Sequence, residues 1–325
     1  MCGAGVIDEQ TRAKIAAFRA VTRTVGTSPF GPDDQIGMLN LLTPAAAREV
    51  MGSADPGRVI DMSVELFVGM PTWTQGGEPP FSMWMQHTPR GSAVDDPVGV
   101  GREQNELVAW SADSMSMFTH TGTHVDTLNH FGYHNKIWNG FDADDHLGSL
   151  GWRVAGADRI PPIIARGVLL DVAGLHGVDV LPDGYGIGSD DLRGALARQA
   201  VELRVGDVVA VRTGRGSTWP DATRYLPREP GLNLEGARFL AESGVVTVGA
   251  DNIAVEQLPS ADPENWMGVH TYLFAECGIP MIEVLDLEEL AREQMWTFAF
   301  LGACMRIRGA TAGPMRPIAM PLVDR

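Results

Sequence analysis

Residues 120–130, HTGTHVDTLNH, gather four side chains that are typical ligands of divalent metal ions. Three are the imidazoles of His120, His124 and His130, and the fourth is the carboxylate of Asp126. Zn²⁺, Mn²⁺ and Fe²⁺ readily accept imidazole nitrogen and carboxylate oxygen as ligands. This density of ligand groups indicates a metal-dependent enzyme. The alternative is a set of surface histidines on a polar loop.

The spacing of the four residues limits how they can share one site. In a strand, His124 and Asp126 would point to one face with their Cα atoms roughly 6.6 Å apart, close enough to bind one ion. A straight strand would separate His120 from His130 by roughly 33 Å, so the chain must bend. Gly122 can take the positive φ of that bend, and the interval from Asp126 to His130 fits one helical turn. We therefore predict a strand, a bend and a short helix, in which the first three ligand-type residues converge with His130 beside them.

The motif resembles that of the cyclase-like metal hydrolases, the family that contains bacterial kynurenine formamidase, isatin hydrolase and trans-dienelactone hydrolase. The resemblance extends over roughly residues 58 to 308, and its further matches are the segments 70–73 (MPTW), 166–171 (RGVLLD), 206–214 (GDVVAVRTG) and 248–251 (VGAD). Leu128 stands where the kynurenine formamidase branch usually has proline. That departure and the length of the chain favour a long branch of the family over a dedicated kynurenine formamidase.

The resemblance implies a role for each residue of the site. It makes His120, His124 and Asp126 ligands of a divalent ion, and it adds His270 and Glu283 as candidate ligands in members with two ions. It also implies that Trp73 contacts the substrate. His130 is the candidate general acid/base, because a histidine suits proton transfer near neutral pH and this one is not needed for the three-ligand set. The resemblance assigns the same role to the matching histidine.

The expected activity is hydrolysis. An ion held by three protein groups keeps open positions, and it lowers the pKa of a water molecule enough to produce a nucleophile near neutral pH. We expect a small cyclic or aryl amide, or a lactone, as the substrate, with one or two Zn²⁺ or Mn²⁺ ions as the cofactor. Two alternatives stay open: a ring-closing cyclase or dehydratase of secondary metabolism, and a non-catalytic metal-binding protein of the same fold.

The fold class expected from the sequence is α/β. Apolar runs at 168–172, 208–211 and 245–248 are typical of strands buried on both faces, and helical segments at 189–200 and 234–243 separate them. A strand at 282–285, a helix at 286–294 and a strand at 296–301 repeat the alternation. The family resemblance implies a swivelling β/β/α domain with a central, mostly buried sheet flanked by helices.

The domain organisation that we predict is an N-terminal helical arm at 1–57 and a cyclase-like metal hydrolase domain at 58–325. The arm would hold a helix at 8–24 and a second helix that opens at Thr43 and Pro44. A strand is expected at 59–66. The Gly- and Pro-rich segment 74–104 reads as a long loop over the site.

Composition excludes several classes of partner. The 325-residue chain carries a net charge of −16, which argues against nucleic acid and anionic membranes. It has no apolar run near the roughly 20 residues that span a bilayer, and its first ten residues do not resemble a secretory signal, so we expect a cytoplasmic protein. Three scattered cysteines do not make a disulfide framework, and Cys277 is better explained as a core residue than as a nucleophile. The partners expected are a small-molecule substrate and, by family precedent, further copies in a homodimer or homotetramer.

Overall fold

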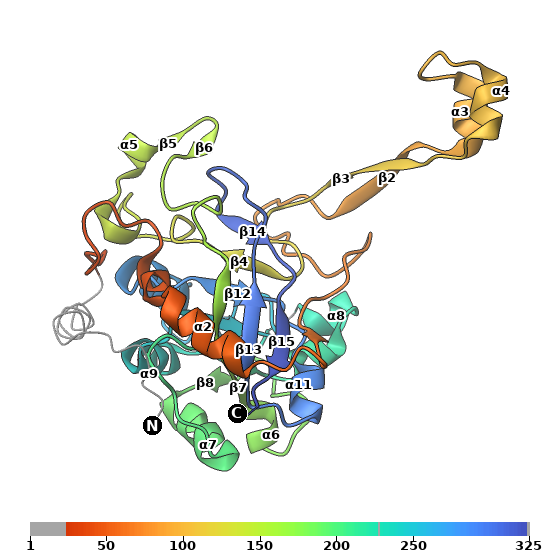
Figure 1. Cartoon of the computed structure of the whole chain (residues 1–325). Coiled ribbons are helices and arrows are strands. Elements are labelled where there is room, and N and C mark those ends of the chain that lie inside the picture. The colour runs from red at the N-terminus through yellow and green to blue at the C-terminus, as the bar shows by residue number, and fades with distance from the viewer. Residues whose placement is uncertain (1–23, 227, 324–325) are drawn as a thin grey trace.

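A nine-stranded sheet forms the centre of the fold in the computed structural model, which describes residues 24–226 and 228–323. From one edge to the other its strands are β1 (Ile60–Asp61), β15 (Ile318–Pro321), β13 (Thr297–Gly302), β7 (Ile163–Asp171), β9 (Val208–Arg212), β11 (Thr247–Ala250), β12 (Met281–Glu283), β4 (His124–Asp126) and β14 (Ala312–Pro314). Figure 1 shows helices on the outside of this curled sheet. The mixed α/β class and the flanked central sheet are confirmed.

The middle of the sheet is parallel, with β7, β9, β11 and β12 side by side. Apolar residues dominate these strands because both faces are covered, and all five residues of β9 are buried. The strands β13, β15, β1, β4 and β14 pair in antiparallel fashion. Parallel neighbours bring their carboxyl ends to one edge, and Asp171, Arg212 and Glu283 end three of these strands there.

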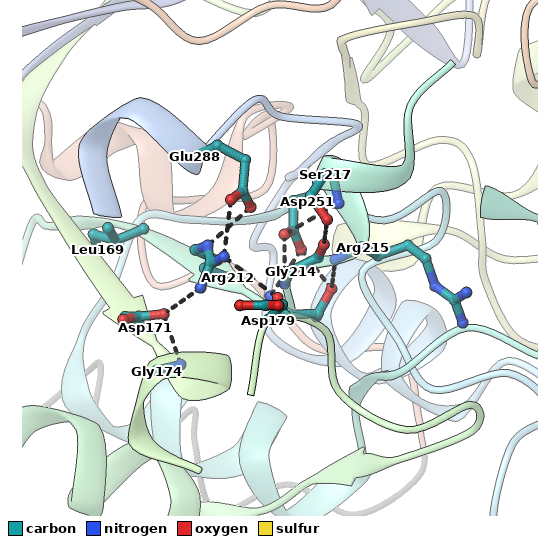
Figure 2. Close-up of polar contacts among 12 residues, drawn as sticks. Leu169, Asp171, Gly174, Asp179, Arg212, Gly214, Arg215, Ser217, Asp251 and Glu288 are labelled. Atoms are coloured by element: carbon teal, nitrogen blue, oxygen red, sulfur yellow. Dashed lines mark hydrogen bonds and ion pairs between the residues drawn. The ribbon is translucent and has the colours of Figure 1, made fainter. Parts of the chain in front are cut away.

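Buried ion pairs and hydrogen bonds join the loops at this edge. Arg212 donates to Asp171 Oδ1 at 2.8 Å and to both carboxylate oxygens of Glu288, as Figure 2 shows. Asp251, which follows β11, accepts hydrogen bonds from the backbone of Thr213 and Gly214. The network fixes the loops after β9 and β11, beside the strand that ends in the site residue Glu283.

The helices and 3₁₀ or π turns surround the sheet. Their bounds are η1 (Gly37–Leu41), α2 (Pro44–Ser53), α3 (Pro89–Asp95), α4 (Arg102–Leu107), η2 (Trp138–Gly140), α5 (Ala143–His146), α6 (Val172–Leu175), α7 (Ser189–Gln199), η3 (Arg215–Thr218), α8 (Ala222–Tyr225), α9 (Leu234–Ser243), α10 (Gly268–His270), η4 (Thr271–Glu276) and α11 (Glu288–Arg292). The predicted helix after Thr43 is α2, and the Thr43 side chain caps it by accepting from Ala46 N. The expected elements in 282–301 are also present as β12, α11 and β13, with ends shifted by one or two residues.

Residues 82–116 form an arm that leaves the body of the protein (Figure 1). Its two strands, β2 (Ser82–His87) and β3 (Ala112–Ser116), pair only with each other, and α3 and α4 form its tip. The prediction of a long loop over the site at 74–104 was therefore wrong for most of that segment. The turn-rich composition of this segment indicates a loop. The hairpin is not visible in the sequence because β2 and β3 are separated by 24 residues, so their pairing is non-local. The remaining small sheets pair β5 (Leu147–Gly148) with β6 (Gly151–Trp152), and β8 (Gly186–Ile187) with β10 (Gly231–Leu232).

The strand predicted at 59–66 is much shorter than expected, since only β1 is formed. It lies at the edge of the sheet, and the chain then turns so that Val64 N donates to Thr123 Oγ1 at 3.0 Å. This hydrogen bond ties the segment to the metal-ligand motif instead of extending the strand.

The N-terminal segment contacts the body along its described part. Gly26 N donates to Ala275 O at 2.8 Å, and Met38 N donates to Gly278 O at 2.7 Å. Apart from residue 24, the helix predicted at 8–24 lies outside the described residues, and the division at 57/58 stays a prediction. Within the described ranges, no helix combines the length and apolar character needed to cross a bilayer.

Candidate metal centre and active-site cavity

Strand β4 holds His124 and Asp126 on one face, two residues apart. The strand lies between β12 and β14, and its residue His124 is directly opposite Glu283. Val125 points to the other face and is completely buried in the main core. Because hydrogen-bonded neighbours fix β4 on both sides, the positions of both ligand-type side chains are set by the sheet.

The bend before β4 orients two imidazoles. Gly122 has φ of +62°, as the spacing predicted, and its carbonyl accepts a hydrogen bond from His124 Nδ1 at 2.7 Å. That bond leaves the lone pair of His124 Nε2 free to bind a cation. His120 bonds through Nε2 to Thr311 Oγ1 at 2.9 Å, so its Nδ1 faces Asp126.

The first three ligand-type residues converge. Asp126 Oδ1 lies 2.7 Å from His120 Nδ1 and 3.1 Å from His124 Nε2. Glu283 Oε2 lies 3.2 Å from the same His124 nitrogen. Such separations suit atoms that each bind one ion at about 2.0–2.2 Å.

Unsatisfied buried atoms provide a separate test of whether these residues fit a metal ion. Among the described residues, His124 Nε2, both carboxylate oxygens of Asp126 and Glu283 Oε1 are buried without a hydrogen-bond partner. Buried polar atoms are costly to leave unpaired. A divalent cation would satisfy this group, and the donor set therefore fits one.

His130 is in a tight turn and not in the helix that the four-residue interval predicted. Its backbone N–H donates to Thr127 O at 3.0 Å. The hydroxyl of Thr127 bonds to Thr311 O at 2.8 Å and to Asn129 Oδ1, so side chains compete with the helical pattern. His130 still reaches the cluster, with Nε2 3.6 Å from Asp126 Oδ2.

His270 and Glu283 come from distant parts of the chain to the same place. His270 ends α10, just before the buried π-helical segment η4. Its Nε2 is 3.5 Å from Glu283 Oε1. Glu283 thus lies between His270 and His124, and the structure brings all six candidate residues of the motif and its later partners into one cluster.

Glu256 is a residue of the site that the sequence did not reveal. It is buried, and its Oε2 accepts from His270 Nδ1 at 2.7 Å and from His270 N at 3.0 Å. These two bonds fix the His270 ring with Nε2 toward Glu283. No local pattern marks Glu256, because the contact depends on the fold of the loop between residues 256 and 270.

Comparison with known proteins places the chain in a family. A family model described as a putative cyclase matches residues 60–257. The chain belongs to the putative cyclase family. The resemblance found in the metal-ligand motif is therefore confirmed.

Solved structures share the fold of this cyclase-family protein. A crystal structure described as a novel cyclase is 27% identical, with a TM-score of 0.79 over 90% of this chain and 95% of that one. Isatin hydrolase A from Ralstonia solanacearum is 22% identical, with a TM-score of 0.63 over 86% and 95% of the two chains. Isatin hydrolase A from Labrenzia aggregata is 20% identical, with a TM-score of 0.61 over 87% and 99%. No curated protein matches the chain.

The buried carboxylates of the cyclase-family site must be balanced by positive charge. Burial lowers the pKa of His124, but Asp126 and Glu283 outweigh it and raise that pKa to about 10. Burial likewise lowers the pKa of His270, while Glu256 and Glu283 raise it to about 10. Burial would raise the pKa of Asp126, yet the surrounding histidines hold it well below its usual value. Either protons or a metal ion must balance these acids.

His130 behaves in the opposite way. Burial and the neighbouring His120 lower its pKa well below the usual value, and Asp126 opposes them only in part. The ring is therefore neutral at physiological pH. A neutral imidazole beside a metal site is suited to accept a proton.

A cavity of about 160 Å³ opens over the cluster. His120, His130, His270 and Glu283 line its base. Its walls include aromatic side chains from four segments: Trp73, Phe118, Phe131 and Trp266. The sequence pointed to Trp73 only. Phe131 follows His130 directly and could have been noted, whereas Trp266 lies too far along the chain to be linked with the motif.

Proposed function

We propose that this cyclase-family protein is a metal-dependent hydrolase that opens a small cyclic or aryl amide, or a lactone. Water attacks the carbonyl carbon, and the product gains a carboxylate. The observation that carries the proposal is the convergence, within the described residues, of buried ligand atoms that lack hydrogen-bond partners beside an aromatic cavity.

The proposed cofactor is Zn²⁺ or Mn²⁺, since histidine and aspartate ligands suit both. Two groups of potential ligands share one carboxylate: His124, Asp126 and Glu283, and His120, Asp126 and His130. The first group would hold one ion, and a second ion would use Glu283 and His270, so that His130 stays free for proton transfer. When bound, the ion would polarise a water molecule and the substrate carbonyl.

His130 is the proposed general acid/base. Its neutral ring accepts a proton at Nε2 from the attacking water and returns it to the leaving nitrogen or oxygen. The position of Nε2, 3.6 Å from Asp126 Oδ2, supports this role because it directs that nitrogen toward the cluster. Asp126 also stabilises the imidazolium that forms.

Glu256 and His270 support the same chemistry. Glu256 fixes the His270 ring, and we propose that His270 and Glu283 either bind a second ion or orient the ligand His124. Trp73, on the cavity wall, would stack on the flat part of an aryl or unsaturated substrate.

Elemental analysis joined to an acid-release screen tests the proposal. The purified protein is analysed for zinc and manganese, then assayed with aryl formamides, isatin-like lactams and unsaturated lactones. We expect a bound divalent ion and acid release from at least one class, with loss of activity after chelation. A protein without divalent metal, or one that leaves all three classes intact when loaded with either ion, would contradict it.

A second candidate is a ring-closing cyclase or dehydratase. Two comparisons support this candidate, because the matching family model is described as a putative cyclase and the 27% identical structure as a novel cyclase. Mass analysis of the product separates the two, because a cyclase would release water and a hydrolase would add it. A non-catalytic metal-binding protein of the same fold is the third possibility, and it predicts bound metal without turnover.

We also propose that the protein is a homodimer or homotetramer in the cytoplasm, with a small molecule and neither nucleic acid nor membrane as its other partner. The arm supports self-association, because Met83, Trp84 and Met115 are about half exposed on it. The net charge of −16 supports the exclusion of nucleic acid and anionic membranes.

A further inference from the structure

The cavity over the metal cluster combines aromatic walls with acidic side chains. Trp73 and Glu78 reach it from the segment before the arm, and Phe118 reaches it from the segment after the arm. Phe131 and Trp266 also line it, with ring centroids 5.8 Å apart. The cavity is therefore lined by several π-systems whose faces or edges can contact a ligand.

The charged residues of the wall are all acids or histidines. Among the described residues that line the cavity there is neither lysine nor arginine. Of the two carboxylates, Glu283 is already engaged with His124 and His270. Glu78 is the lining carboxylate that belongs to neither group of potential metal ligands.

Glu78 is available to a ligand. It is half-buried, its Oε2 accepts from Gly76 N at 2.8 Å, and it makes no ion pair within the ranges 24–226 and 228–323. A carboxylate oxygen can accept more than one hydrogen bond. Glu78 therefore keeps both its charge and acceptor capacity for a group that enters the cavity.

Aromatic faces next to a carboxylate attract cations. Ammonium groups bind the electron-rich faces of tryptophan and phenylalanine, and the attraction grows when the site is partly desolvated. The net charge of −16 adds a long-range field that concentrates cations around the protein. An anionic substrate would meet repulsion from Glu78, and the described wall has no lysine or arginine to offset it.

We propose that this cavity selects substrates that carry a positively charged ammonium group away from the scissile carbonyl, with Glu78 as the residue that determines this specificity. The proposal deepens the proposed hydrolase function and rests on it. The carbonyl lies over the metal cluster, while the ammonium group lies among the aromatic rings next to Glu78.

A matched set of three substrates tests the selection. They share one hydrolysable aryl group and differ in a single substituent: trimethylammoniomethyl, its neutral isostere 2,2-dimethylpropyl, or carboxymethyl. For the metal-loaded enzyme we expect kcat/KM about tenfold higher for the cation than for the neutral isostere, and lowest for the anion. The aryl scaffold is the formamide, lactam or lactone that the acid-release screen identifies.

Variants of Glu78 then assign the effect to that residue. Glu78→Gln should lower kcat/KM for the cation about five- to tenfold and leave the neutral isostere unchanged, while Glu78→Lys should reverse the order of cation and anion. Glu103→Gln, on the arm helix α4, is the matched control. It removes the same charge outside the cavity and should leave kcat/KM for all three substrates unchanged.

A binding measurement separates failure of this inference from failure of the proposed function. Calorimetry with benzyltrimethylammonium and with phenylacetate needs no turnover. We expect benzyltrimethylammonium to bind more tightly than phenylacetate, and Glu78→Gln to lower the affinity for benzyltrimethylammonium at least threefold. If the protein shows these binding results but no turnover, only the proposed hydrolase function is overturned. If kcat/KM is equal for the cation and its neutral isostere, or if Glu78→Gln does not change binding of the cation, the proposed selection of ammonium substrates is overturned.

Discussion

At the scale of single residues, His130 differs from His124 and His270. The acids that surround His124 and His270 raise the pKa of those two rings, whereas burial and His120 lower the pKa of His130. His124 and His270 thus favour a cation or a proton, whereas His130 stays neutral. This division is the basis for assigning proton transfer to His130.

Replacing His130 by alanine should separate catalysis from metal binding. We expect turnover to fall by about 10²–10⁴-fold, because general acid/base catalysis contributes that much, while the bound metal changes little. His124→Ala is the matched variant and should lose the metal. Metal loss of equal size in both variants would make His130 a ligand and contradict its assigned role.

The pKa of His130 also sets a pH dependence. A base whose pKa is lowered stays unprotonated to a lower pH, so kcat/KM should remain level from neutral pH down to below 6.5 and fall only beneath that. A bound cation would lower the pKa of His130 further and move the decline of kcat/KM to a still lower pH. Metal content is measured at each pH as the control, and an acid limb centred at pH 7 or above with metal retained would argue against His130 as the base.

At the scale of elements, the bend before β4 controls the ligand geometry. Gly122 has φ of +62°, and a Cβ there would collide with Leu66 Cδ2. The carbonyl of Gly122 also orients the His124 ring. Gly122 therefore determines the backbone conformation of the bend, the packing against Leu66 and the orientation of the His124 ring.

Gly122→Ala should weaken both folding and metal binding. The left-handed backbone costs a residue with a Cβ about 1–2 kcal/mol, and relief of the strain would move the carbonyl that holds His124. Urea unfolding of the metal-free protein and a chelator competition measure the two effects. Gly206→Ala is the control, because that glycine also has positive φ but nothing lies near its Cβ. Its stability should also fall, from backbone strain alone, while its metal affinity stays unchanged. Equal metal affinity in both variants would contradict the role of the bend.

At the scale of the whole molecule, the arm is the feature that the body of the fold does not explain. An isolated two-stranded hairpin is marginally stable in water, and both β2 and β3 have mostly exposed side chains. The segments at the base of the arm carry Trp73, Glu78 and Phe118 to the cavity. A partner that holds the arm would therefore also influence the substrate site.

We expect sedimentation equilibrium to give a mass above that of the 35.0 kDa chain. Changing Met83 and Met115, which are opposite each other across the hairpin, to serine should shift the distribution toward monomer because it removes apolar surface. Val178→Ser, at an exposed position outside the arm, is the control and should leave the mass unchanged. A wild-type monomer at micromolar concentration would refute self-association through the arm.

The ligand motif and the buried strands could be predicted from the sequence because they are local patterns. The even spacing of His124 and Asp126 required only the period of a strand, and the bend required only Gly122. The helix predicted after Asp126 was wrong because Thr127 bonds to Thr311, which is 184 residues away in the chain. The hairpin of the arm was missed for the same reason, since its strands are separated by two helices and their connecting segments.

The sequence by itself determined the donor chemistry of the site, the α/β class and the family, because these depend on residue types and short-range periodicity. Only the tertiary structure decided that Glu283 stands opposite His124, that Glu256 holds His270, and that Glu78 and Trp266 line the same cavity. Those contacts join segments more than ten residues apart, in several cases more than a hundred. The first is a pair across the antiparallel strands β12 and β4 and the others join loops, and no local pattern encodes which strands and loops meet.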